Sequence, residues 1–219
     1  MTPAELAALH PRLYHLTTPG AWKRIQTHGL LPASELVARS DRSRDEKDRL
    51  LSQPRPGSVP LTVPGMGEAL IYDNLPMTDA ALRRCLDDGL TPADWLRMIN
   101  DRVFFWPTKS GLRSLRESKL NRSRDRVTLV VDTLALAERY LDRLELTPIN
   151  SGSTIRQPAR RGLATFAPVA DYSHAQWRRL RRDRGEVRGL DTIKEVVARG
   201  GVPDIAGCVL DVRDEPAIG

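Results

Sequence analysis

The sequence predicts an α+β protein, because segments with the pattern of a strand alternate with segments with the pattern of a helix. Residues 13–16 read as a short strand, and a helix-like segment follows them. Residues 127–131 are a continuous apolar run of high β propensity, and residues 133–143 then have the character of a helix. At 219 residues, of which 40% are hydrophobic, the chain is most simply a single domain over residues 1–219.

The composition favours an acidic partner. Lysine and arginine together number 34 against 28 acidic residues, which gives a net charge of +6. Arginine dominates and binds phosphate bidentately, so nucleic acid or a pyrophosphate-containing ligand is the natural expectation. No apolar run reaches membrane-spanning length and the N-terminus has no signal-peptide pattern, so no membrane partner is expected. Two distant cysteines, Cys85 and Cys208, argue against a disulfide framework or a zinc site and fit a reducing cytoplasm.

The stretch from residue 13 to residue 31 is the centre of the functional argument. His15 and Thr17 alternate along the first strand, so both side chains point to one face at the strand's exit, where open αβ folds often bind ligands. An imidazole and a hydroxyl there suit a sugar or an amide group. The alternative is that His15 is a hydrogen-bonded, half-buried histidine with a structural role.

A helix is predicted directly after this strand. Thr18 has the character of an N-cap and Pro19 suits the first helical position, while Gly29 ends the periodic pattern.

Two later regions predict additions to the core. Residues 38–58 mix both charges and end in prolines, which indicates an exposed, partly helical loop that can move; its arginines either close over a phosphate or form a solvated face. Residues 78–101 predict a helical insertion, with one helix capped by Thr78 and reaching about residue 88 and a second starting at Thr91.

The aromatic run at residues 103–106 predicts a strand. One of Phe105 and Trp106 is expected in the core while the other flanks a planar ligand, the alternative being that both rings are core. Residues 163–167 predict another strand. The small polar residues Asn150, Ser151 and Gly152 form a loop that allows close backbone approach.

The last third of the chain carries a basic helix and a single acidic candidate. Residues 173–184 hold several arginines, Arg178 and Arg182 among them, and form either a phosphate-backbone contact or a solubilising face. Glu195 lies in an apolar, strand-like run, where it faces outward on an edge or points into a cleft. Strand alternation places it on the same face as Val197. A closing strand is predicted at residues 207–212.

These segments, in this order, resemble the DarT-type ADP-ribosyltransferases. The residues that carry the resemblance are LYHLT with the helix and Gly29-Leu30 after it, then FFWPTKS, then the late strand with Glu195 ahead of Val202-Pro203. Those enzymes are nucleic-acid-modifying relatives of the poly-ADP-ribose polymerases and the RNA 2′-phosphotransferases. The resemblance spans residues 13 to 212 and implies a split, mixed or antiparallel sheet core with flanking helices.

The resemblance also implies roles for individual residues. The catalytic residues are Glu195 and Arg55, with the arginine near the pyrophosphate; Arg39, Arg42 and Arg49 are alternatives to Arg55. The residues expected to hold NAD are His15, Leu16, Thr17, Phe105, Trp106 and Lys109. The residues expected to guide the acceptor strand are Asn150, Ser151, Gly152, Arg178 and Arg182.

The sequence departs from that family in two places. The asparagine that the family has early in the helix after the histidine strand is missing, and Lys109 stands where the family tends to have arginine. These departures concern mainly the choice of substrate.

The implied function is transfer of ADP-ribose from NAD to a base of single-stranded DNA or RNA, without a metal. A toxin or phage-defence role is implied as well, with a macrodomain-type or other antitoxin as partner. The alternatives are a non-catalytic nucleic-acid or nucleotide-binding module on the same fold, and transfer to protein.

Overall fold

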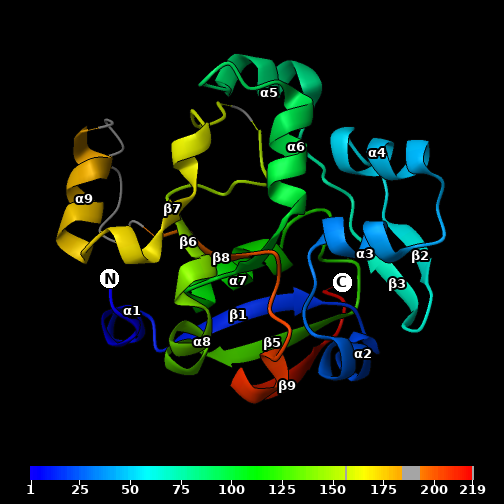
Figure 1. Cartoon of the computed structure of the whole chain (residues 1–219), viewed down its shortest axis with the longest axis horizontal. Coiled ribbons are helices and arrows are strands. Elements are labelled where there is room, and N and C mark those ends of the chain that lie inside the picture. The colour runs from blue at the N-terminus through cyan, green and yellow to red at the C-terminus, as the bar shows by residue number, and fades with distance from the viewer. Residues whose placement is uncertain (156, 184–192, 219) are drawn as a thin grey trace.

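The computed structural model of the chain describes residues 1–155, 157–183 and 193–218, and it confirms the α+β class. Within these residues the strands form three antiparallel sheets with the orders β1-β5-β9, β2-β3 and β4-β8-β6-β7 (Figure 1). The strands are β1 (Arg12–Thr17), β2 (Val59–Val63), β3 (Gly67–Ile71), β4 (Arg102–Phe105), β5 (Arg126–Asp132), β6 (Leu144–Thr147), β7 (Ala167–Pro168), β8 (Glu195–Arg199) and β9 (Val209–Glu215).

Helices flank these sheets. They are α1 (Pro3–Leu9), α2 (Ala21–His28), α3 (Ala33–Arg39), α4 (Arg44–Ser52), α5 (Asp79–Cys85), α6 (Pro92–Asn100), α7 (Lys109–Arg116), α8 (Thr133–Tyr140) and α9 (His174–Asp183). The predicted caps of α5 and α6 are confirmed, because Thr78 Oγ1 accepts from Ala81 N and Thr91 Oγ1 accepts from Asp94 N. Within the described residues, no helix is both long and apolar enough to cross a membrane.

The two larger sheets meet at the end of β4. Tyr14 of β1 and Trp106, the residue after β4, exchange two backbone hydrogen bonds of 2.9 and 2.8 Å. One core therefore serves both sheets, with side chains such as Leu13, Leu129 and Val196 in a single cluster. The central sheet is thus split into two parts that share a corner.

Strand β8 is buried on both faces. Val196 and Ala198 join the main core, whereas Val197 packs in a second cluster with Trp95 of α6 and Phe166. Glu195 begins this strand and, by alternation, lies on the face of Val197, below α6.

The hairpin β2–β3 packs with α3 and α4 beside the main sheets, around a small cluster of its own (Figure 1). The charged segment at residues 38–58 contains α4, which begins with a capping box between Ser43 and Glu46. Its predicted helical part is thus present, and its mobility stays a prediction.

The predicted cap of the helix after β1 is wrong. Helix α2 begins at Ala21 with Gly20 as N-cap, because Gly20 takes a left-handed conformation (φ +75°) and the Thr18 carbonyl accepts from Ala21 N in a turn. The Thr18 side chain is therefore not used as a cap.

The predicted strand at 163–167 is largely wrong. A 3₁₀ turn, Leu163–Thr165, replaces it, because Asp88 and Thr165 side chains accept the N–H groups of Leu163 and Gly162 at 2.7 and 2.9 Å. Only the two residues of β7 remain extended.

Two boundaries also move. Helix α5 stops at Cys85 instead of about residue 88, because the next residues hydrogen-bond to Arg161. The closing strand starts at Val209, after a 3₁₀ turn at Ile205–Cys208, and extends to Glu215.

Candidate functional site

Glu195 is a buried carboxylate held by neutral donors. It is 2% exposed, and its Oε2 accepts from the hydroxyl of Ser151 at 2.8 Å and from the Ser151 N–H at 3.3 Å. Burial raises the pKa of Glu195 to about 7, although the Ser151 bonds and the charge of Arg161 lower it in part. Near neutral pH this group therefore exists in both protonation states, as a general acid or base requires.

Arg161 shapes the loop that carries Ser151. The guanidinium is buried and donates to the carbonyls of Ser151, Ser153 and Ala159 at 3.0, 2.9 and 3.1 Å. It also lies 5.5 Å from the ring centre of Trp95, a cation–π distance. Arg161 thus holds the turn whose N–H and O–H point at Glu195, while no ion pair joins Glu195 to any residue among those described.

His15 is held in one tautomer. Its Nδ1 lies 2.9 Å from the carbonyl oxygen of Phe104, which can only accept, so Nδ1 carries the proton. Burial lowers the pKa of His15, so the ring is neutral at pH 7 and Nε2 is a hydrogen-bond acceptor. The expected structural hydrogen bond is present, and it leaves the second nitrogen available for a ligand.

The sheet register brings the strands of His15 and Glu195 to the same corner. Strand β4 pairs with β8 so that Phe105 lies opposite Val196. One further step of that register would place Trp106 opposite Glu195, but Trp106 pairs with Tyr14 instead. The chain thus changes partner at the end of β4, from β8 to β1, and the sheet is split at this point. His15 lies on β1 and Glu195 on β8, the two strands on either side of the split.

Arg55 is engaged by the protein itself. Its Nε, Nη1 and Nη2 donate to the Tyr72 carbonyl (2.9 Å), the Leu50 carbonyl (2.5 Å) and Asn100 Oδ1 (2.9 Å). Burial lowers its pKa to about 10, so it remains a cation at neutral pH. The structure therefore gives Arg55 a bracing position, and no contact among the described residues joins it to Glu195.

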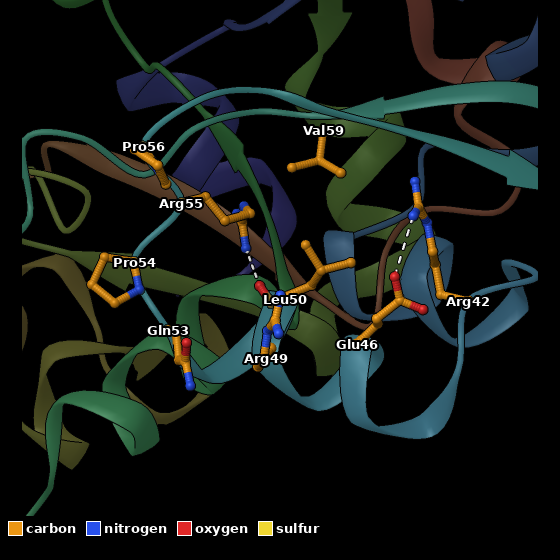
Figure 2. Close-up of a pocket in the computed structure, with 9 residues that line it drawn as sticks. All are labelled: Arg42, Glu46, Arg49, Leu50, Gln53, Pro54, Arg55, Pro56 and Val59. Carbon is orange, nitrogen blue, oxygen red and sulfur yellow. Dashed lines mark hydrogen bonds and ion pairs between the residues drawn. The ribbon is translucent and has the colours of Figure 1, made fainter.

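Arg55 also lines a cavity of about 320 Å³ beside α4, together with Arg42 and Arg49 (Figure 2). Of the alternatives to Arg55, Arg39 and Arg42 form ion pairs with Glu35 and Glu46, each four residues away on the chain. Arg49 is exposed in this cavity.

The remaining predicted residues fall into two groups. Phe105 is fully buried and Trp106 is half-buried, which confirms that one of the two rings enters the core. Thr17 is buried and Leu16 half-buried on β1, near the split. Those at or near the surface are Lys109, Asn150, Gly152, Arg178 and Arg182. Arg184, the end of the predicted basic helix, lies outside the described residues.

Sequence reasoning missed three residues around these groups: Trp95, Arg161 and Tyr72. Trp95 has the helical spacing of an ordinary core residue, and Arg161 is one of many arginines. Tyr72 follows β3, and its carbonyl binds Arg55 while its phenol lies beside Thr17 and Thr18. No local pattern marks any of the three, because their contacts all come from distant parts of the chain.

A search of curated proteins found no match to the chain. A family model described as "Family of unknown function (DUF7002)" matches residues 11–209, which include β1, β8 and the site between them. That description states no activity. The chain belongs to the DUF7002 family.

Proposed function

We propose that the chain is an NAD-dependent mono-ADP-ribosyltransferase that modifies a base of single-stranded nucleic acid. The observation that carries this proposal is Glu195: a fully buried carboxylate without a direct counter-charge among the described residues, held by Ser151 at the split of the sheet. The resemblance of β1, β4 and β8 to the DarT-type enzymes supports it as well.

The chemistry of the reaction suits this carboxylate. Transfer breaks the bond between the nicotinamide nitrogen and ribose C1′ and forms a bond from C1′ to the acceptor base. Nicotinamide leaves as a neutral molecule, and positive charge develops on the sugar as in glycoside hydrolysis. Ionised Glu195 would stabilise that charge and take the proton that the acceptor loses.

His15 supplies the complementary group. A neutral imidazole with a free Nε2 accepts a hydrogen bond from a ribose hydroxyl or a carboxamide N–H. Both groups occur in the nicotinamide riboside part of NAD, so an acceptor at this position fits this substrate. Arg55 donates three of its five N–H groups to protein acceptors and lines a cavity, so its contact with the pyrophosphate stays a prediction.

Nucleic acid is favoured as the acceptor by α9. Arg178 and Arg182 are both exposed on this helix, and the whole chain carries a net charge of +6. A base must be unpaired or flipped out to reach ribose C1′ in such a site, so single strands are the better acceptors.

The test is incubation of the purified chain with labelled NAD and a panel of single-stranded DNA, RNA and protein. Glu195→Gln keeps the size of the side chain but removes its charge, and we expect it to lower transfer by at least about 100-fold. The matched control is Glu138→Gln, on the exposed side of α8, which should transfer as the wild type does.

Each outcome decides between the candidates. Label on a nucleic acid with the wild type, and none with Glu195→Gln, supports the proposal. Weaker binding of that nucleic acid by the double variant Arg178→Gln/Arg182→Gln would show that α9 contacts it. Label on protein alone would make the chain a protein-modifying transferase. Binding of NAD or nucleic acid without any covalent product would identify a binding module and refute the proposal.

A further inference from the structure

Arg126 is a buried arginine without a counter-charge. It is the first residue of β5, is 4% exposed, and forms no ion pair with any residue in the described part of the chain. Its Nη2 donates to Asn121 Oδ1 at 2.7 Å, and its Nε has no hydrogen-bond partner among the described residues. Buried charges in proteins are normally paired, so this arginine requires an explanation.

The neighbouring charges compensate Arg126 only in part. Arg124 pairs with Asp73 at 3.1 Å, and Arg116 pairs with Glu215 at 3.6 Å. Both carboxylates are thus engaged by other arginines. Burial lowers the pKa of Arg126, Tyr72 and Asp73 raise it in part, and the charges of Arg124 and Arg116 lower it further. Among the described residues, the three arginines therefore have two carboxylates at ion-pair distance.

The groups around Arg126 are hydrogen-bond donors. Its guanidinium lies 4.6 Å from the ring centre of Tyr72, whose phenol oxygen makes no hydrogen bond within the described residues. The Thr17 and Thr18 hydroxyls lie close enough to that phenol to affect its pKa, which burial raises. The guanidinium of Arg126, with an unpartnered Nε–H among the described residues, and the Tyr72 phenol beside it both offer donors that suit a ligand with several acceptor oxygens.

The site has an approach from solvent. Thr18 lines a cavity of about 350 Å³ between the exit of β1, the first turn of α2 and the β2–β3 hairpin. Arg124, whose charge acts on Arg126, has a side chain that is 40% exposed. A phosphate group on a larger molecule can therefore reach Arg124, next to the buried guanidinium of Arg126.

We propose that Arg126, Arg124 and Tyr72 form a binding site for a phosphate group. The proposal does not depend on the transfer reaction or on Glu195. The phosphate belongs to a dinucleotide or to a nucleic-acid backbone, since both offer the same oxygens.

The experiment is titration of the full chain with inorganic pyrophosphate, followed by calorimetry and by thermal unfolding. Wild type should bind pyrophosphate and unfold at a higher temperature in its presence. Arg126→Met and Arg124→Ala should each weaken binding at least about tenfold, because each removes a charged donor. Tyr72→Phe should weaken it severalfold and keep the stacking on Arg126.

The control is Arg97→Ala, which removes one charge from an exposed ion pair with Asp48. It should bind pyrophosphate as wild type does. If Arg97→Ala and Arg124→Ala weaken pyrophosphate binding equally, the binding depends only on the overall charge of the protein, and the proposed site is wrong. Absence of pyrophosphate binding by wild type would overturn it too. If Arg126→Met does not fold, Arg124→Ala and Tyr72→Phe, which alter partly exposed side chains, decide the matter.

Parallel titrations with ADP-ribose and with a single-stranded oligonucleotide identify the source of the phosphate. If Arg124→Ala binds ADP-ribose more weakly than wild type does, the phosphate comes from a dinucleotide. If Arg124→Ala instead binds the oligonucleotide more weakly, the phosphate comes from a nucleic-acid backbone. Glu195→Gln should bind pyrophosphate unchanged. Pyrophosphate binding through Arg126 in a protein that transfers no ADP-ribose would refute the proposed function and leave this site standing.

Discussion

Two buried glutamates on neighbouring strands have different surroundings. Glu145 of β6 and Glu195 of β8 are 7% and 2% exposed, and the register places them two residues apart along the paired strands. Arg102 binds both carboxylate oxygens of Glu145, at 2.6 and 3.1 Å, and itself lies 4.1 Å from the ring centre of Phe166. Among the described residues, Glu195 has only the neutral donors of Ser151 at hydrogen-bond distance.

The difference shows that burial of a carboxylate does not by itself mark a site. The charge of Glu145 is neutralised by Arg102, so this ion pair links β6 to β4. Glu195 has no equivalent partner, so its proton remains free to exchange near neutral pH and its charge remains available to a substrate. The two buried arginines differ in their hydrogen bonds, since Arg55 donates to three protein oxygens whereas the Nε of Arg126 has no partner among the described residues.

The largest expected effect on stability is that of Glu145→Gln. This change leaves the Arg102 guanidinium buried without its counter-charge, so we expect the free energy of unfolding to fall by about 3–5 kcal/mol. Urea denaturation at pH 7 measures it. Glu35→Gln, which removes the exposed pair with Arg39, is the control and should cost less than about 1 kcal/mol. A cost of similar size in both variants would contradict the structural role given to Glu145.

The second prediction concerns the pH dependence of stability at Glu195. The folded-state pKa of about 7 lies above its ordinary value of 4.5. Between these values the folded chain keeps a proton that the unfolded chain has released, so rising pH destabilises the wild type. Relative to wild type, Glu195→Gln should therefore gain about 3 kcal/mol in unfolding free energy between pH 4 and pH 8.

Urea denaturation of both proteins across this range measures that gain. The lowered pKa of His15 acts in the opposite direction, because it costs stability as pH falls below its ordinary value of 6.5. His15 is present in both proteins, so the difference between them isolates Glu195. A difference that does not change with pH would show that Glu195 has the same pKa in the folded and the unfolded chain.

The smallest effect is expected from Ser151→Ala. The Ser151 hydroxyl stabilises the ionised form of Glu195, so its removal should raise the pKa of that carboxyl further. If transfer requires ionised Glu195, the alkaline-rising limb of the rate should move up by about one pH unit. Ser153→Ala, on the same loop without a bond to Glu195, is the control. A pH–rate profile that does not shift would show that Ser151 does not affect the pKa of Glu195.

Local signals in the sequence are enough to predict several of the elements. The apolar run of β5, the threonine caps of α5 and α6 and the basic helix α9 are all encoded within a few residues. Alternation along β8 also placed Glu195 on the face of Val197 before any contact was known. The prediction failed at Leu163, where the side chain of Asp88, 75 residues away, accepts the backbone N–H.

Which charges are paired follows from the folded arrangement and not from any local pattern. Glu195 and Ser151 are separated by 44 residues, and Arg102 and Glu145 by 43. Periodicity and capping report on neighbours within a turn or two of the chain, so they cannot show which arginine meets which carboxylate. The bracing of Arg55, the loop held by Arg161 and the missing counter-charge of Arg126 all depend on contacts of that long range, because electrostatic compensation acts through space and is independent of separation along the sequence.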